Sequence, residues 1–383
     1  MDTKPDLSHI QFIILPDFLL CLLIATKPSE LFRFLGFCLY TYFNVRGMYF
    51  TTGDPLQDYS IGSAFGAQIF IAIYLLWLTS PIDEFRHERD TVPPRELPLW
   101  RRLYWAFTVC RNVRGVGWNY LVSNVPPRPK ESRWAFMQSR LLRIAWYFVI
   151  VDLSETYMRL NPIIFASQGI YAGPSISSQG YLLRCANVIA YMARPYGLLT
   201  IQYLMLAVVT VGLGFCDPAD WPDLFGNWED SYTVRNFWGK TWHQTLRRFV
   251  TSIGRFFVRL FSFKKGTSGS SYTQLYVAFI VSGLMHCAGD AMVGWEYFGS
   301  SLPFFVLQAL AITVEDGVIE LYRRSGVRLP LKVTRWIGYL WVFVWFSFSC
   351  PIYIDWSLRA DIGRTAVLPI SLVQYVYHGL TPT

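Results

Sequence analysis

Eight apolar stretches of about membrane-spanning length constrain this chain more than any other feature of its sequence. Hydrophobic residues make up 53% of the 383 residues and charged residues only 16%, against about a quarter in a soluble domain. Because lipid cannot hydrogen-bond the backbone, a segment that crosses the bilayer must satisfy its own N–H and C=O groups as a helix. We therefore predict an all-α polytopic membrane protein with about eight transmembrane helices (8–10) and additional interfacial helices. The predicted spans are residues 12–26, 31–50, 60–79, 140–158, 197–215, 272–289, 302–320 and 333–350.

Lysine and arginine are distributed unevenly between the two sides that these spans define. With the first loop in the cytosol, the cytosolic segments hold 23 of the 34 basic residues, as the positive-inside rule requires. Both termini are then lumenal, and two long polar insertions, at about residues 80–139 and 216–271, are cytosolic. The apolar residues 181–194 are interrupted by arginine and end before Pro195, so we expect a half-helix or re-entrant piece there. We predict a single membrane-embedded domain over residues 1–383, in the endoplasmic reticulum membrane.

The sixth predicted span carries an ionisable side chain within an apolar helix. Ser282, His286 and Asp290 follow one another at four-residue intervals, so they form one polar ridge on that helix. Gly283 and Gly289 lie beside the ridge and would let another backbone or a ligand come close. An ionisable residue inside a membrane is costly and usually marks function. The alternative is a histidine that is satisfied by a neighbouring helix or that sits at the headgroup boundary.

Within the second insertion, aromatic and basic side chains recur at helical spacing over residues 231–265. On one helix the apolar side chains share a face, which comprises Trp238, Trp242, Phe249, Ile253, Phe256 and Leu260. An adjacent ridge comprises His243, Arg247, Thr251, Arg255 and Arg259. We expect this helix to lie at the membrane interface. Its arginines suit either anionic lipid headgroups or the phosphates and adenine of coenzyme A.

Other kinds of site are not indicated. The sequence has no G-x-S-x-G, G-x-G-x-x-G, P-loop or H-E-x-x-H motif, and its seven cysteines form no C-x-x-C pair, so neither a metal site nor a disulfide framework is expected. The net charge of +8 follows from the positive-inside distribution and does not indicate nucleic acid. His87, in the charged cluster DEFRHERD, is expected on the solvated surface, and His9 and His378 are expected to carry no chemistry. The kind of chemistry that these exclusions leave is acid/base catalysis by His243 and His286 on an apolar substrate held in the membrane.

Two motifs resemble a known family. Residues 236–244, NFWGKTWHQ, and residues 282–290, which begin SGLMH and end in Asp, are similar to the paired signature of membrane-bound O-acyltransferases. They most resemble the wax-synthase-like branch, especially the fungal acetyltransferases of terpenoid and meroterpenoid pathways, as does RGVGW at residues 114–118. The resemblance implies helices around a central catalytic tunnel, with His286 as the catalytic histidine and His243 where other branches carry Asn or Asp. It also implies an acyl-CoA donor arriving from the cytosol and a small hydrophobic alcohol arriving through the lipid bilayer.

We expect direct transfer without an acyl-enzyme, because neither motif offers a suitable serine or cysteine nucleophile. His286 would take the proton of the acceptor hydroxyl, while His243, with Gln244, would orient the thioester or stabilise the developing oxyanion. Asp290 would either hold the His286 tautomer or make a hydrogen bond at the helix end. Further substrate-binding residues are expected to be Asn236, Trp238, Trp242 and Ser282, and those that bind the coenzyme are expected to be Arg247 and Arg255. No cofactor is expected to be bound permanently, since acetyl-CoA is a co-substrate.

Three other interpretations are open at the level of sequence. A long-chain wax ester synthase would differ in the width of a tunnel whose lining the sequence does not reveal. A transporter would use the intramembrane histidine as a proton relay, although the chain shows no inverted repeat. A non-catalytic lipid-binding scaffold would tolerate replacement of both histidines.

Overall fold

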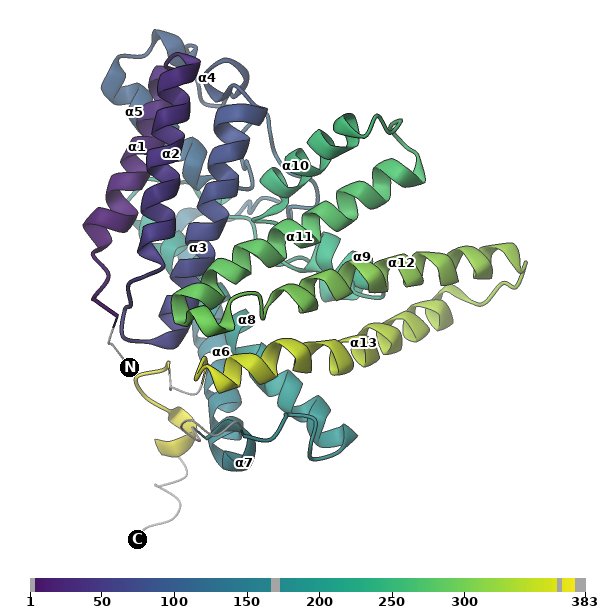
Figure 1. The fold of residues 1–383 in the computed structure, drawn as a ribbon. Coiled ribbons are helices and arrows are strands. Elements are labelled where there is room, and N and C mark those ends of the chain that lie inside the picture. The colour runs from purple at the N-terminus through teal and green to yellow at the C-terminus, as the bar shows by residue number, and fades with distance from the viewer. Residues whose placement is uncertain (1–3, 167–172, 364–366, 376–383) are drawn as a thin grey trace. The chain divides into compact units, whose positions relative to one another are not determined.

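The computed structural model describes residues 4–166, 173–363 and 367–375, and these residues are mostly helical (Figure 1). Within these ranges no β-strand is formed, and extended residues pair only as isolated bridges. The prediction of an all-α protein is therefore confirmed.

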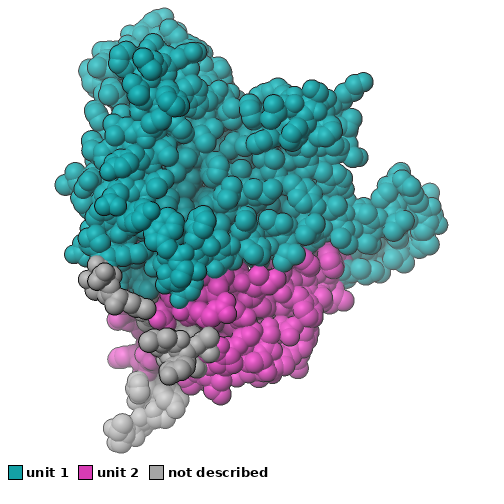
Figure 2. Space-filling model, viewed as in Figure 1, with its two compact units in different colours: residues 1–124, 227–337 teal, residues 125–226, 338–383 magenta. Residues whose placement is uncertain are grey.

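The chain divides into two compact units, shown in teal and magenta in Figure 2. Unit 1 comprises residues 1–124 and 227–337, and unit 2 comprises residues 125–226 and 338–383. Every site residue expected from the sequence belongs to unit 1. The single domain over the whole chain stays a prediction.

The helices of unit 1 are α1 (Leu15–Thr26, preceded by the π-helical turn Ile10–Ile14), α2 (Glu30–Gly47), α3 (Pro55–Ile73, continued by the π-helical turn Tyr74–Leu78), α4 (Pro81–Glu84), α5 (Leu99–Arg111), α9 (Val234–Asn236, continued by the π-helical turn Phe237–Thr241), α10 (Arg247–Leu260), α11 (Ser268–Val293) and α12 (Leu302–Arg324). Those of unit 2 are α6 (Arg133–Leu160), α7 (Pro162–Phe165) and α8 (Tyr181–Gly212). Helix α13 (Leu331–Arg359) belongs to unit 1 up to residue 337 and to unit 2 beyond it.

Five helical segments are long and apolar enough to cross a membrane, which makes this an integral membrane protein. They are Pro55–Leu78, Tyr181–Gly212, Ser268–Val293, Trp295–Arg324 and Leu331–Arg359. The apolar helix Ile10–Thr26 is shorter. Helices α2 and α6 coincide with two further predicted spans but carry several charged side chains along their length. The predicted number of eight is thus not confirmed, while all eight predicted spans fall on helices.

Side-chain caps define where the two helices that matter most for the site begin. The carboxylate of Asp54 accepts the N–H of Gln57 at 2.8 Å, and Pro55 occupies the first position of α3, where its missing N–H is not needed. The hydroxyl of Thr267 accepts the N–H of Ser270 at 3.3 Å at the start of α11. Each cap therefore satisfies one of the first N–H groups of its helix without a neighbouring element.

Helix α11 is the central element of unit 1, because it packs against α3, α10 and α12 (Figure 1). Its contact with α3 depends on glycine. A Cβ at Gly62 would lie 2.6 Å from the Ala288 carbonyl oxygen, and one at Gly289 would lie 2.6 Å from the Tyr59 carbonyl oxygen. Small residues let two membrane helices approach this closely. The close approach expected at Gly289 is therefore present.

The structure corrects the interpretation of residues 181–194 in unit 2. They are not a separate half-helix, since α8 runs without a break through Pro195 to Gly212. The arginine that marked the end of the apolar run, Arg194, is buried and pairs with Glu155 of α6 at 3.3 Å. A buried charge with a partner on the adjoining helix does not end a span.

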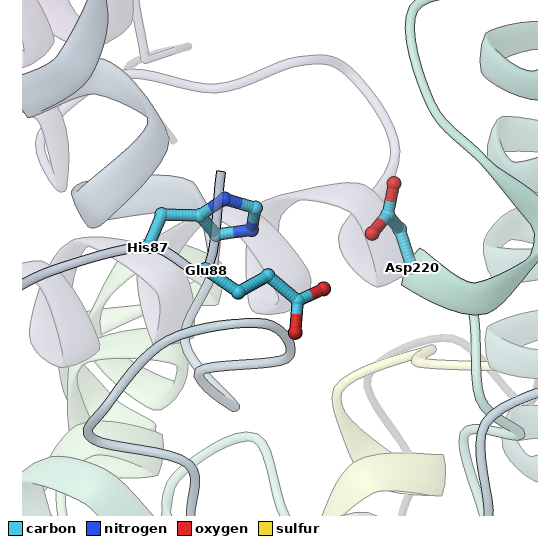
Figure 3. Close-up of side chains that lie close together, drawn as sticks. All are labelled: His87, Glu88 and Asp220. Atoms are coloured by element: carbon cyan, nitrogen blue, oxygen red, sulfur yellow. The ribbon is translucent and has the colours of Figure 1, made fainter. Parts of the chain in front are cut away.

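The loop after α4 also differs from expectation, since His87 is half-buried rather than solvated. Its ring packs edge-to-face on Trp118 at 5.2 Å, and the next N–H, of Glu88, donates to the Gly117 carbonyl at 2.8 Å. Gly117 has φ +79° and leaves no room for a Cβ beside the imidazole. Figure 3 shows His87 and Glu88 together with Asp220, which ends a short 3₁₀ turn of unit 2. Because Asp220 belongs to the other unit, we assign no metal site to these side chains.

Candidate active site

His286 lies on α11 between two aromatic rings of neighbouring helices. The ring of Phe305, on α12, stacks on the imidazole with centroids 4.6 Å apart, and that of Tyr59, on α3, stacks at 5.8 Å. Nδ1 of His286 is 2.8 Å from the Tyr59 hydroxyl and 3.4 Å from the Ser63 hydroxyl. Among the described residues no hydrogen bond reaches Nε2, and the ring is half-buried. Nε2 is therefore the atom that a substrate proton could approach.

Asp290, one turn after His286, is fully buried and serves the start of the next helix. Its carboxylate accepts the N–H of Ser301 at 2.9 Å and the Ser301 hydroxyl at 2.6 Å. The Ser301 hydroxyl is in turn 3.3 Å from the Tyr59 hydroxyl. Of the two roles that the sequence allowed, Asp290 thus makes the hydrogen bond at a helix end. It has no direct hydrogen bond to His286 and is connected to it through Ser301 and Tyr59. Ser282, one turn before His286, is half-buried.

The segment that carries His243 is not the continuous helix expected from its spacing. After α9 the chain makes the π-helical turn Phe237–Thr241, becomes extended at Trp242 and is helical again only from Arg247. Trp238 and Trp242 therefore do not share a helix face with Phe249. The predicted ridge from His243 to Arg259 is wrong for the same reason, although its arginines from position 247 onward do lie on α10.

Gln244 is the side chain that stabilises this non-helical turn. Its amide nitrogen donates to the carbonyl oxygens of Trp238, at 3.1 Å, and Trp242, at 2.5 Å. Its oxygen accepts from the guanidinium of Arg247 at 2.7 Å, and the same guanidinium nitrogen donates to the Gly239 carbonyl at 2.8 Å. The side chains of Gln244 and Arg247 thus replace main-chain hydrogen bonds that a helix would make. Burial lowers the pKa of Arg247.

His243 is held within this turn and is neutral at physiological pH. Its Nδ1 is 2.8 Å from the Thr245 hydroxyl. Burial, together with the nearby positive charge of Arg114, lowers the pKa of His243 to about 4. Arg114 is itself buried and begins the RGVGW piece. A neutral imidazole is both a hydrogen-bond donor and an acceptor.

Trp238 connects the two histidine motifs. Its ring lies 5.9 Å from that of Trp242, which adjoins His243 at 5.4 Å. On its other side it lies 6.5 Å from Phe305, the ring stacked on His286. Its indole N–H donates to Gln308 of α12 at 3.3 Å. The structure therefore brings the two motifs together along one aromatic wall.

The remaining expected residues lie around this wall in different settings. Asn236 ends α9 and is half-buried, and its N–H donates to Thr233 at 2.9 Å. Helix α9 is fixed by the carboxylate of Glu315, which accepts the N–H groups of its first two residues at 2.6 and 3.1 Å. Arg255 is exposed on α10, where its guanidinium bonds Ser252 at 3.0 Å.

The sequence did not reveal several residues that shape this site, namely Tyr59, Ser63, Ser301, Phe305, Gln308 and Glu315. The last four lie at or on α12, an apolar span that carries two acidic residues near its middle. Buried polar side chains in such a span are a usable signal, because they must find partners inside the protein. Tyr59 offered no comparable signal, since it sits near the end of a predicted span where tyrosine is common.

We expect Gly289→Ala to disturb the site through packing alone. The added methyl group would meet the Tyr59 carbonyl and the Ser63 hydroxyl. Helix α3 must then move away from α11, which should lower stability by about 1–3 kcal/mol and reduce activity with it. Thermal unfolding in detergent and the acyl-transfer rate measure the two effects. The matched control is Gly317→Ala on α12, where a methyl group meets nothing within 4 Å. Equal stability of the two variants would contradict the close α3–α11 contact.

Comparison with known proteins gives two family matches. Residues 221–307 match the membrane bound O-acyl transferase family, and residues 132–212 match the C-terminal domain of aspirochlorine biosynthesis protein F. The first match covers both histidine motifs and Phe305, but not Tyr59.

Individual relatives extend the similarity over nearly the whole chain. Acetyltransferase ple2 of Rhodocybe pseudopiperita is 32% identical over 382 residues, which are 98% of this chain and 97% of the relative. Acetyltransferase eriL of Hericium erinaceus is 32% identical over 332 residues, 85% of this chain and 84% of the relative. O-Mevalon transferase yanI of Aspergillus niger is 28% identical over 323 residues, 74% of this chain and 68% of the relative.

Proposed function

Since this chain belongs to the membrane-bound O-acyltransferase family and is an acyltransferase, we propose that it transfers an acetyl group from acetyl-CoA to the hydroxyl group of a small hydrophobic alcohol. The observation that carries this proposal is the aromatic wall from His286 through Phe305, Trp238 and Trp242 to His243. Two histidines on one apolar wall suit a reaction between a thioester and an alcohol that is poorly soluble in water. The names of the relatives, acetyltransferases ple2 and eriL, favour acetyl as the transferred group.

In the proposed reaction His286 acts as the general base. Its Nε2 removes the proton of the acceptor hydroxyl while the hydroxyl oxygen attacks the thioester carbonyl carbon. The new C–O bond forms, the carbonyl electrons move to oxygen, and collapse of this oxyanion breaks the C–S bond. The departing thiolate of coenzyme A takes the proton from His286. The histidine thus returns to its starting state without an acyl-enzyme.

His243 is proposed to donate a hydrogen bond to the developing oxyanion. Its low pKa keeps the imidazole neutral, so one ring nitrogen carries a proton and the other accepts. The Thr245 hydroxyl is 2.8 Å from Nδ1, and we propose that Nδ1 is the acceptor of this pair, which makes Nε2–H the donor. Preorganised donors at such a position supply much of the rate enhancement in enzymatic acyl transfer. Gln244 supports this geometry by holding the turn.

The remaining roles follow from position. Arg255, exposed on α10, and Arg247 are proposed to bind the phosphates of coenzyme A, for which guanidinium is well suited. Asn236 and Ser282 are proposed to contact the substrates. Trp238 is packed among Phe279, Phe304 and Phe305. Such a crowded wall favours a two-carbon acyl group over a long chain, and thus an acetyltransferase over a wax ester synthase.

The acceptor is proposed to be a terpenoid-type alcohol of fungal secondary metabolism, met in the endoplasmic reticulum membrane. The test uses purified protein in detergent with acetyl-CoA or palmitoyl-CoA and a panel of polycyclic terpenoid and straight-chain alcohols. Thiol release and mass spectrometry of the ester should show transfer from acetyl-CoA to a polycyclic alcohol. Transfer from palmitoyl-CoA alone would instead identify a wax ester synthase. No thiol release with any pair would overturn the proposal.

A further inference from the structure

We propose that Tyr59, Ser301 and Asp290 form a directed hydrogen-bond chain that fixes the tautomer of His286, with the proton on Nδ1 and the lone pair on Nε2. The three residues are positioning residues, since none of them faces the reacting atoms. This inference rests on the proposed role of His286 as general base. It names what makes that base competent before any substrate is bound.

The direction of the hydrogen-bond chain is set at its buried end. An ionised carboxylate can only accept hydrogen bonds, and Asp290 accepts both the N–H and the hydroxyl proton of Ser301. Ser301 lies at the N-terminus of α12, where the helix dipole favours a negative charge. The single hydroxyl proton of Ser301 is therefore committed to Asp290, at 2.6 Å.

The next two bonds follow from this one. Because Ser301 has committed its proton, its oxygen can only accept from the Tyr59 hydroxyl, 3.3 Å away. The Tyr59 hydroxyl and Nδ1 of His286 are 2.8 Å apart, and either atom could be the donor; in the proposed chain the phenol oxygen accepts from the imidazole, so Nδ1 carries the proton. A neutral imidazole has one N–H, which leaves Nε2 unprotonated. The opposite tautomer would make His286 unable to take a proton from an alcohol at Nε2.

The geometry around the hydrogen-bond chain favours one arrangement. Tyr59 and Ser301 are buried, which keeps bulk water away from both hydroxyls. The Ser63 hydroxyl lies 3.4 Å from the same Nδ1, farther than the Tyr59 hydroxyl at 2.8 Å. The three residues come from α3, α11 and the start of α12, so the tautomer depends on the packing of three helices.

Asp290→Asn tests the direction without removing the cap of α12. The amide oxygen can still accept the Ser301 N–H, while the amide nitrogen now faces the Ser301 hydroxyl and donates to it. Every bond in the hydrogen-bond chain then reverses, and Tyr59 donates to Nδ1. We expect kcat to fall by at least about a hundredfold, since a histidine held in the wrong tautomer loses its function as a base. The KM for acetyl-CoA should be unchanged.

Tyr59→Phe removes the middle of the hydrogen-bond chain and should lower kcat by about tenfold or more, with the same unchanged KM. Ser301→Thr keeps the hydroxyl and should retain activity, whereas Ser301→Ala should not. The matched control is Tyr276→Phe, which removes a tyrosine hydroxyl bonded to Thr313 between α11 and α12. That variant should keep the kcat of the wild type.

A direct measurement separates this inference from the proposed reaction. The protein has five histidines, so ¹⁵N-histidine labelling with His286→Ala as the reference assigns the imidazole of His286 by NMR. The wild type should show protonated Nδ1 and unprotonated Nε2, and Asp290→Asn should show the reverse. Protonated Nε2 in the wild type, or full activity of Asp290→Asn, overturns the positioning role while leaving His286 as an essential residue. An active His286→Ala variant overturns the proposed function itself.

Discussion

Replacement of His286 by alanine is expected to lower acyl transfer by at least about a thousandfold, to the level of membranes without the protein. In the proposed reaction Nε2 of His286 receives the hydroxyl proton, while Phe305 stacks on the ring and the Tyr59 hydroxyl contacts Nδ1. Binding of acetyl-CoA should persist, because the imidazole contributes to the reaction rather than to affinity for the coenzyme. Thiol release, ester mass spectrometry and acetyl-CoA binding on the same preparation measure these effects.

The control for this variant is His9→Ala, which removes an exposed histidine outside the site. It should transfer at the rate of the wild type. If His286→Ala is expressed, binds acetyl-CoA and still forms the ester, then another group is the base. If the variant fails to bind acetyl-CoA, the imidazole has a binding role that the proposed mechanism does not contain.

His243→Ala is expected to lower the rate by at least about a hundredfold, the usual value of one positioned oxyanion donor. The more informative variant is His243→Asn. An amide can donate a hydrogen bond but cannot exchange a proton near neutral pH. Because the pKa of His243 is about 4, we expect hydrogen bonding to be its role, so that His243→Asn is at least about ten times as active as His243→Ala.

The dependence of the rate on pH provides a second measure of the role of His243. The imidazole stays neutral from about pH 6 to pH 8, since burial and Arg114 hold its pKa far below that range. The shape of the profile over this range should therefore be the same in the wild type and in His243→Asn. Loss of one limb of the profile in His243→Asn, or equal activity of the Asn and Ala variants, would show that His243 transfers a proton.

The elements that the sequence predicted correctly are those in which a local pattern decides the structure. The run that became α11 is apolar over most of its length and begins with a capping threonine, so a long helix is its only stable form within a bilayer. Ser282, His286 and Asp290 share that helix, as their spacing required. The number of spans was less secure, because α2 and α6 combine apolar and charged residues in proportions that fit either a span or a packed helix.

The break at Trp242 could not be predicted from periodicity. Residues 238–260 have helical spacing, yet the buried amide of Gln244 satisfies two carbonyl groups that a helix would have paired with its own N–H groups. A side chain that competes with the backbone in this way has no signature in the apolar pattern. The consequence is large, because the break turns Trp238 towards α11 and α12 instead of along one interfacial helix.

The hydrogen-bond partners of His286 could not be predicted from the sequence for a different reason. Tyr59 is one of 23 tyrosines and stands 227 positions from the histidine that it bonds. Ser301 lies in a short polar loop that looks like an ordinary connection between two spans. Their roles arise only when α3 and α12 pack against α11, and helix packing depends on side-chain shape across the whole interface.

The contacts of helix α12 determine which substitutions can change the space for the substrate. Ser301, at its start, bonds Asp290, and Phe305 stacks on His286. Farther along the helix, Gln308 accepts from Trp238 and Glu315 fixes α9. Helix α12 thus contacts the surroundings of both imidazoles. A tilt or rotation of this helix would move both imidazoles together. Substitutions on its remaining surface can remould the space for substrate while the spacing between base and oxyanion donor stays constant.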